Sequence, residues 1–375
     1  MRDVGIVGLA QSGKTTLFNA LTRAGAPAGG AAGKASVAAV PVPDPRVDVL
    51  SELERSRKRV FTQARFVDVA GLSAGGPGGG LAAQGRGDPG GSSLAPRSTG
   101  GPGGSSLAPR LLGALREADA LAMVLAAWDE TGPDPVEAAA ELTLELTVAD
   151  LESVAGGAEK AAKKARAGVK DAALEAEVLA RARDLLDQGT PLRTARWEPE
   201  EARVLRNFAP LTLKPALAVL NLAEGDAAEA AGRAAEAEAK LGLPTVAVAA
   251  ALEAEAAELP PEDAAELLAG YGVERGGLDQ VVGAAWRLLD LMTFLTTGED
   301  ETRAWEVHRG ATAPEAAGRI HSDLQRGFIR AEVIACDDLV AAGGWDAARS
   351  KGLLRTESKS YVVQEGDVLH IRFNV

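Results

Sequence analysis

The chain has 375 residues, 46% of them hydrophobic, which is enough for two or three folded domains. Only 4% are aromatic, so the domain cores are expected to be aliphatic. The formal net charge of −13 argues against a protein that wraps nucleic acid, because phosphate contacts need a broadly basic surface, and specific DNA binding is not expected.

Three features of the sequence indicate its compartment. The single cysteine, Cys336, excludes a disulfide framework and fits a reducing environment. No apolar run approaches the roughly 18–20 residues that cross a bilayer. The start, MRDVGIVGLAQSGKTT, has Asp3 and a glycine-rich turn where a signal peptide needs an unbroken apolar stretch. We therefore expect a cytoplasmic protein with no membrane partner.

In chain order, the first predicted element is a short apolar strand at 4–9, followed by a glycine-rich turn and a helix at 15–24. Four more buried strands are predicted, at 66–71, 120–128, 215–221 and 244–250. Helical segments separate them, which is typical of βα units on a parallel sheet. The predicted class is therefore α/β for this part of the chain.

Residues 73–110 interrupt this rhythm, because they are rich in glycine, proline and serine. Within them PGGSSLAPR occurs twice, at 89–97 and 102–110. Such a composition cannot bury enough apolar surface to offset its ordering entropy, so disorder is expected there.

Residues 136–187 interrupt it a second time and are rich in Ala, Glu, Leu and Lys. We expect two antiparallel helices with a loosened tip, because Gly156, Gly157 and Gly168 break the helical run. In each helix, residues at helical spacing are predicted to share one face. Its members are Leu144, Val148 and Leu151 in the first helix and Leu174, Val178, Arg181 and Leu185 in the second.

Five basic residues lie near the expected tip: Lys160, Lys163, Lys164, Arg166 and Lys170. This run has two interpretations, a solvated helix face or a docking surface for RNA or an acidic partner.

From about residue 292 the pattern changes to strand, turn, helix and strand. Residues 360–375 predict a closing pair of strands around the turn Glu365-Gly366-Asp367. This end of the chain is therefore expected to form a small α+β module.

The most specific motif is GLAQSGKT at 8–15, which matches GxxxxGK[ST] between a predicted strand and a predicted helix. Gly8 and Gly13 let the backbone curl so that its N–H groups point at phosphate oxygens, and the helix adds its positive dipole end. Lys14 would reach the β and γ oxygens, and the Thr15 hydroxyl would ligate Mg²⁺. The alternative is a glycine-rich turn with an incidental lysine.

A second motif, DVAG at 68–71, follows a predicted strand. Asp68 would hold Mg²⁺ through a water, and the Gly71 N–H would meet the γ-phosphate. By itself DxxG also describes an ordinary strand-ending turn, but its position after a phosphate loop favours the nucleotide role.

A third motif is VLNLAE at 219–224, where an apolar strand ends at Asn221 and a carboxylate follows at Glu224. An aspartate in this place would accept hydrogen bonds from guanine N1–H and the 2-amino group, whereas adenine presents a bare acceptor at N1. The longer Glu224 should loosen the guanine contact and admit adenine, since a hydrogen bond to a charged group is worth roughly 1.5–3 kcal/mol. An Asx-type helix cap at the start of 224–240 is the alternative, and both can hold.

With these motifs in order, the chain resembles the YchF-type, Obg-like ATPases, a branch of the translation-factor-related P-loop GTPases. The resemblance runs through nearly all 375 residues. It includes GIVGL (5–9), VPVPDPR (40–46), DVAGL (68–72), LREADA (115–120), DPVEAAAELTLELTVADLE (134–152) and NLAE (221–224). Two C-terminal stretches, GATAPEAAGRIHSDLQRGFIRAE (310–332) and GDVLHIRFNV (366–375), resemble the TGS module, a β-grasp domain.

The resemblance implies an ATP-preferring, ribosome-associated hydrolase with antiparallel helices inserted in its nucleotide domain. It places nucleotide contacts on Gln11, Ser12, Gly13, Lys14, Thr15, Thr16, Asn221, Leu222 and Glu224, and magnesium on Thr15. Leu72 stands where a Ras-like GTPase carries its water-orienting glutamine, which implies slow intrinsic turnover.

The chain also departs from the family pattern. The stretch 29–40 lacks the threonine that completes the Mg²⁺ shell, and Ser36 lies several places too late. Ala114 stands where a histidine is often suspected of assisting hydrolysis, and Ala249-Ala250-Ala251 replaces a serine-and-lysine loop that backs the base. The segment 85–110 is longer than the family's second switch. We expect nucleotide binding to survive these departures and hydrolysis to be the step they impair.

The predicted architecture follows from these assignments. An OBG-type P-loop nucleotide-binding domain is expected at 1–132 and 206–275, a helical coiled-coil domain at 133–205, a linker helix at 276–291 and a TGS domain at 292–375. The predicted function is an ATP-binding (GTP possible), Mg²⁺-dependent, slowly hydrolysing nucleotide switch that contacts the ribosome. The alternatives are a nucleotide-binding scaffold with little turnover and a GTPase of the same fold, since Asn221 is retained.

Overall fold

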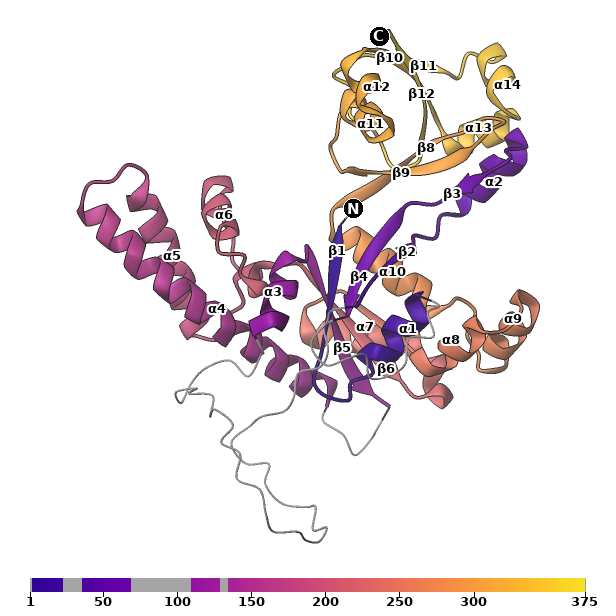
Figure 1. The fold of residues 1–375 in the computed structure, drawn as a ribbon. Helices are drawn as coiled ribbons and strands as arrows, with labels where there is room; N and C mark the ends of the chain where they lie inside the picture. The colour runs from indigo at the N-terminus through magenta and orange to yellow at the C-terminus, as the bar shows by residue number, and fades with distance from the viewer. Residues whose placement is uncertain (1, 23–35, 69–108, 129–133, 375) are drawn as a thin grey trace, which may run out of the picture.

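The computed structural model describes residues 2–22, 36–68, 109–128 and 134–374 (Figure 1). The disorder predicted for 73–110 falls, up to residue 108, outside the described residues. In the parts of the chain that are described, no helix is long and apolar enough to cross a membrane.

The first sheet has six strands in the order β2-β4-β1-β5-β6-β7. Its strands are β1 (Asp3–Val7), β2 (Ser36–Pro41), β4 (Gln63–Asp68), β5 (Ala120–Ala127), β6 (Ala216–Leu222) and β7 (Thr245–Val248). Every neighbouring pair is parallel except β2 and β4. Because β5 and β6 lie in the middle and are covered on both faces, their sequences are continuous apolar runs. The α/β prediction is confirmed.

Helices cover both faces of this sheet. One face packs against α1 (Lys14–Thr22), α8 (Ala250–Ala257) and α10 (Gly277–Leu288), and the other against α3 (Pro109–Glu117), α7 (Ala230–Leu241) and the first half of α4. Another helix, α9 (Pro261–Gly270), packs against α8. The N-terminus of α10 is fixed by the buried Glu253 carboxylate, which accepts hydrogen bonds from the Gly277 and Leu278 amides.

A helical hairpin projects from the sheet on the side away from α8 and α9 (Figure 1). It consists of α4 (Pro135–Arg166) and α5 (Ala172–Asp187), and α6 (Pro199–Arg206) follows between the short 3₁₀ turns Leu192–Thr194 and Leu211–Leu213. The predicted break at Gly156 and Gly157 is wrong, because α4 runs through both residues. Gly157 is needed for packing instead, since a Cβ there would overlap the Phe208 ring. Gly168, with φ of +72°, does lie in the turn between the two helices.

The apolar face predicted for α4 is wrong at Leu144, although Leu151 does pack against the hairpin core. Leu144 is exposed, and the buried face carries Leu142, Leu146 and Ala149. These side chains pack on the first sheet and not on α5, because the first half of α4 lies along that sheet.

In α5 the predicted face is confirmed at Val178, which is fully buried in the hairpin core, and at Leu174 and Leu185, which pack against that core. It is wrong at Arg181, which is exposed.

The second sheet also has six strands, in the order β11-β10-β12-β8-β9-β3. They are β3 (Arg59–Val60), β8 (Leu291–Thr296), β9 (Thr302–His308), β10 (Phe328–Ala335), β11 (Arg355–Glu357) and β12 (Asp367–Phe373). One face is covered by α11 (Ala313–Ile320) and α12 (Ser322–Arg326), the other by α13 (Cys336–Ala342), α14 (Trp345–Ser350) and α2 (Pro45–Glu54). The predicted α+β character of this end is confirmed.

The predicted strand pair at 360–375 is wrong, since only β12 forms there and it lies between β10 and β8. The residues before the turn are held as a loop by the buried Asp367 carboxylate, which accepts hydrogen bonds from the Tyr361 hydroxyl and the Gln364 amide. These hydrogen bonds of Asp367 therefore hold residues 361–364 in a loop instead of a second strand.

One strand of the second sheet, β3, and one helix that covers it, α2, come from the N-terminal part of the chain. The segment between β2 and β4 leaves the first sheet and contributes α2 and β3 to the C-terminal domain (Figure 1). No sequence pattern indicated this exchange. The boundaries predicted for the four regions stay predictions.

Candidate functional site

The loop between β1 and α1 has the backbone that its glycines allow. Gln11 and Gly13 have φ of 60° and 83°, in the left-handed region. A Cβ on Gly8 would lie 2.5 Å from both the Ser12 hydroxyl and the Val124 carbonyl oxygen, so only glycine fits there. The loop is thus curled tightly at the carboxyl end of a central parallel strand, where ligands of such sheets bind.

Lys14 lies inside this curl. Its side chain is buried, and its ammonium donates to the carbonyl oxygens of Gly8 at 3.0 Å and Leu9 at 2.6 Å. Burial lowers the pKa of Lys14, and the nearby Asp68 carboxylate partly opposes that shift. The loop therefore holds a cation at its centre.

Asp68 ends β4, the neighbour of β1 that pairs Ile6 with Asp68. Its Oδ2 accepts a long hydrogen bond of 3.4 Å from the Thr15 hydroxyl. Its Oδ1 is buried and has no hydrogen-bond partner among the described residues, as is also true of the Ser12 hydroxyl. Burial raises the pKa of Asp68, and Lys14 and Thr15 oppose the shift. An unpaired buried carboxylate oxygen next to a hydroxyl is a donor set that fits Mg²⁺.

Asn221 joins three parts of the site. It is the sixth residue of β6 and is 5% exposed. Its amide nitrogen donates to the Ser12 carbonyl oxygen at 3.4 Å, and its Oδ1 accepts from the Ala250 amide at 3.2 Å. A Cβ on Gly13 would overlap this amide, which is a second reason for glycine in the loop. The Asx-cap alternative is wrong, because the Asn221 side chain contacts Ser12 and Ala250 instead.

The residues after Asn221 divide between the core and the surface. The Leu222 side chain is buried in the core beneath the sheet, so only its backbone can contact a ligand. Glu224 is exposed at the start of the 3₁₀ turn Glu224–Glu229, which has no side-chain cap. Gln11 and Thr16 are exposed as well.

One residue of the site was missed by sequence reasoning. Trp128 follows β5, is 38% exposed, and has its indole beside Gly13 and Asn221. An aromatic residue at the end of a predicted strand, in a chain with only 4% aromatics, was the signal that could have found it. Its exposed ring offers a flat apolar surface on the side of the site where Asn221 lies.

The remaining positions lie either outside the described residues or away from the loop. Gly71 and Leu72 lie outside the described residues. Ala114 packs against the core beneath the sheet. His308 and His370 lie on strands of the second sheet, and His321 lies beside α12.

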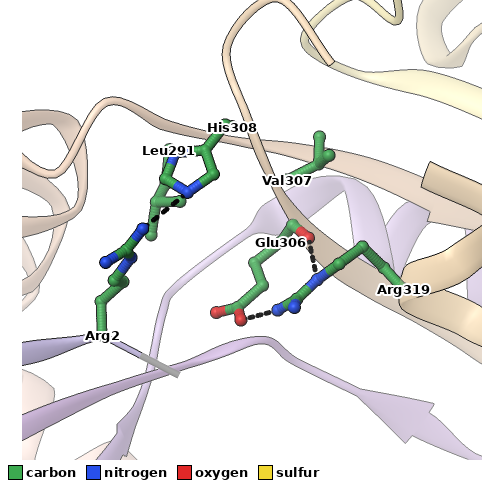
Figure 2. A pocket seen from close by; sticks show the side chains of 6 residues that line it. All are labelled: Arg2, Leu291, Glu306, Val307, His308 and Arg319. Atoms are coloured by element: carbon green, nitrogen blue, oxygen red, sulfur yellow. Dashed lines mark hydrogen bonds and ion pairs between the residues drawn. The ribbon is translucent and has the colours of Figure 1, made fainter. Parts of the chain in front are cut away.

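A cavity of about 240 Å³ lies elsewhere, between the start of β1 and the second sheet (Figure 2). Its two cations are already paired, Arg2 with Asp119 and Arg319 with Glu306. Arg2 also contacts the His308 ring nitrogen at 2.8 Å, so this cavity lies where β1 meets the second sheet, and the described residues that line it offer no unpaired cation to a ligand.

The curled loop with its central lysine, the aspartate on the neighbouring strand and the asparagine at the sheet edge define a P-loop nucleotide-binding protein. Comparisons with known proteins agree. A family model described as YchF-GTPase_C, protein of unknown function (DUF933), matches residues 291–374. The ribosome-binding ATPase YchF of Haemophilus influenzae is 38% identical over 384 residues, 99% of each chain.

A rice protein, the Obg-like ATPase 1 of Oryza sativa subsp. japonica, is 30% identical over 388 residues, which cover 99% of this chain and 92% of that protein. The structure of the Schizosaccharomyces pombe YchF GTPase matches with a TM-score of 0.79 at 26% identity, covering 99% of this chain and 97% of that one. The chain therefore belongs to the YchF family.

Proposed function

We propose that this protein binds ATP, hydrolyses it slowly and acts as a nucleotide switch on the ribosome. The observation that carries the proposal is the assembly of Lys14, Asp68 and Asn221 around one loop. The names of the relatives support it, since curated members from Haemophilus influenzae and Bacillus subtilis are called ribosome-binding ATPases.

Mg²⁺ is the proposed metal, held by the Thr15 hydroxyl and the Asp68 carboxylate. No cluster of three or more His, Cys, Asp or Glu side chains that could hold a metal occurs in the described ranges, which suits an ion that keeps waters and takes phosphate oxygens. When bound, the ion would neutralise charge on those oxygens. Lys14 would bind the phosphates, and Asn221 would orient the base.

The base preference is proposed to rest on Glu224. We expect the parent protein to bind an ATP analogue more tightly than the matching GTP analogue in calorimetric titrations. Glu224→Asp is expected to shift the ratio of the two dissociation constants toward GTP by about 10-fold, because one charged hydrogen bond to guanine is regained. Glu229→Asp, on the same exposed turn, is the matched control and should leave the ratio unchanged. A parent protein that clearly prefers GTP would favour the GTPase alternative.

The scaffold alternative is motivated by Ala114 and by the absence of a threonine in 29–40. A phosphate-release assay with ATP and Mg²⁺ separates the two proposals. Steady release above background supports the hydrolase, and binding without release supports the scaffold.

Ribosome contact is proposed for the hairpin tip and for the C-terminal domain, which we assign as a TGS module. The five basic residues of the tip are all exposed, and no acidic residue lies between Lys160 and Lys170. A protein of net charge −13 thus presents a local cationic surface at the end of a projecting hairpin.

Reversing Lys163 and Lys164 to glutamate is expected to weaken ribosome co-sedimentation by about 10-fold, since phosphate contacts dominate such binding. ATP affinity should stay unchanged, because the tip is remote from the loop at 8–15. The matched control is Arg183→Glu with Arg203→Glu, which makes the same charge change on exposed residues of α5 and α6. If the tip variant co-sediments as well as the parent, the result would favour the interpretation of these lysines as a solvated helix face.

A further inference from the structure

The chain between β2 and β4 connects the candidate nucleotide site with the C-terminal domain. β2 and β4 are antiparallel neighbours, and their register pairs Ser36 with Asp68. Asp68 is the carboxylate beside Lys14 and Thr15. A displacement of Asp68 is therefore expected to shift both β2, which precedes residues 42–62, and β4, which follows them.

The helix in this segment is part of the C-terminal core. Val47 and Leu50 of α2 are fully buried, in one cluster with Leu295, Ile334 and Val368 of the second sheet. Packed interiors transmit displacements because they have little empty space. A displacement of α2 is therefore expected to reach the second sheet.

The end of the segment is hydrogen-bonded to the turn between β8 and β9. The Ser56 hydroxyl donates to the Gly298 carbonyl oxygen at 2.7 Å, and the Arg57 amide donates to the Glu299 carbonyl oxygen at 2.9 Å. β3 then pairs in parallel with β9, Arg59 opposite Thr302 and Val60 opposite Arg303. The returning chain enters β4 three residues later.

The start of the segment is fixed by a chain of charges. The buried Asp44 caps α2 and accepts two hydrogen bonds of 2.7 Å from the Arg46 guanidinium. Arg46 also donates to Glu365 at 2.6 Å, and Glu365 accepts from the Thr293 amide at 3.0 Å. Arg46 thus links the start of α2 to β8 and to the loop that precedes β12.

We propose that residues 42–62 couple the nucleotide site to the C-terminal domain, so that a nucleotide bound at Lys14 and Asp68 changes the stability of β9 and α13. The proposal rests on the proposed function, because it requires a nucleotide at that loop. The coupling is reciprocal by thermodynamic necessity, so a partner on the C-terminal domain changes nucleotide affinity by the same factor.

Hydrogen exchange on the full chain tests the coupling, with ATP and Mg²⁺ as the probe and calorimetry as the binding control. In the parent protein, ATP is expected to slow exchange about 3-fold or more in 302–308 and 336–342, beyond its effect on the first sheet. Arg46→Ala should remove at least about half of that remote slowing while changing ATP affinity less than about 3-fold.

Glu365→Gln is a second, milder variant, because its amide oxygen can still accept from Thr293 while the charge facing Arg46 is lost. It should reduce the remote slowing in the same direction as Arg46→Ala. The matched control is Glu357→Gln on β11, at the opposite edge of the second sheet from β3, which should keep the full response.

The outcomes separate the two proposals. If ATP produces no binding heat, the proposed function fails and the coupling fails with it. If ATP binds and slows exchange only in the first sheet, or if Arg46→Ala and Glu365→Gln both keep the parent's remote response, the coupling alone is overturned. Remote slowing that both variants weaken and Glu357→Gln preserves supports it.

Discussion

Lys14→Ala is expected to weaken ATP binding about 100-fold or more. The ammonium lies buried in the curl of the loop, 3.0 Å from the Gly8 carbonyl oxygen and 2.6 Å from that of Leu9. A charge-assisted hydrogen bond contributes roughly 1.5–3 kcal/mol, and two lost phosphate contacts exceed the about 2.7 kcal/mol that corresponds to 100-fold. Isothermal titration with ATP and Mg²⁺ measures the loss.

The control for this change is Lys240→Ala. Lys240 is an exposed lysine of α7 that, among the described residues, pairs with Glu236 on its own helix, so its loss should leave ATP affinity at the parent value. Thermal unfolding without nucleotide shows whether the Lys14 variant is folded. A folded Lys14→Ala protein that bound ATP as tightly as the parent would place the phosphate site elsewhere.

Asp150→Ala is expected to destabilise the protein by about 2–4 kcal/mol, which for a domain of this size lowers the unfolding midpoint by roughly 5–10 °C. Asp150 of α4 is fully buried and accepts hydrogen bonds from the Leu211 and Thr212 amides at 2.8 and 2.7 Å. Alanine would leave both buried amides without an acceptor. Burial raises the pKa of Asp150, so relief of its desolvation offsets part of the loss.

Hydrogen exchange locates the effect of this change. Because the turn at 211–213 leads into β6, the strand that carries Asn221, the Asp150 variant should exchange faster at 211–222. Asp187→Ala, at the exposed end of α5, is the matched control and should change the midpoint by less than about 1 °C. An Asp150 variant as stable as the parent would mean that water replaces the carboxylate.

Much of the nucleotide domain was predictable because its signals are local. The phosphate loop needs only eight consecutive residues, and its glycines are required by backbone angles and close contacts within those residues and their nearest strands. The central strands β5 and β6 are continuous apolar runs, which follows from burial on both faces. Boundaries shifted by one to three residues, as at β4, which begins three residues before the predicted strand, and at Gly8, where the loop begins before the apolar run ends.

Predictions failed where a residue's partner lies far away in the chain. Periodicity placed Leu144 on the buried face of α4, but contact with the sheet selected Leu142 and Leu146. Gly157 was interpreted as a helix break, whereas the Phe208 ring about fifty residues later requires a glycine inside the helix. Trp128 was read only as the end of a strand, and its place beside Asn221 needs the packed sheet.

Local sequence was therefore sufficient for the phosphate loop, the parallel sheet and the two-part architecture, because short-range backbone geometry and apolar periodicity specify them. The tertiary structure alone decided that α2 packs on the second sheet and β3 pairs with it, and that Asn221 joins Ser12 to Ala250. The physical reason is that a two-residue strand such as β3 has almost no pattern of its own. It is selected by an open sheet edge some 240 residues away, which exists only after the chain has folded.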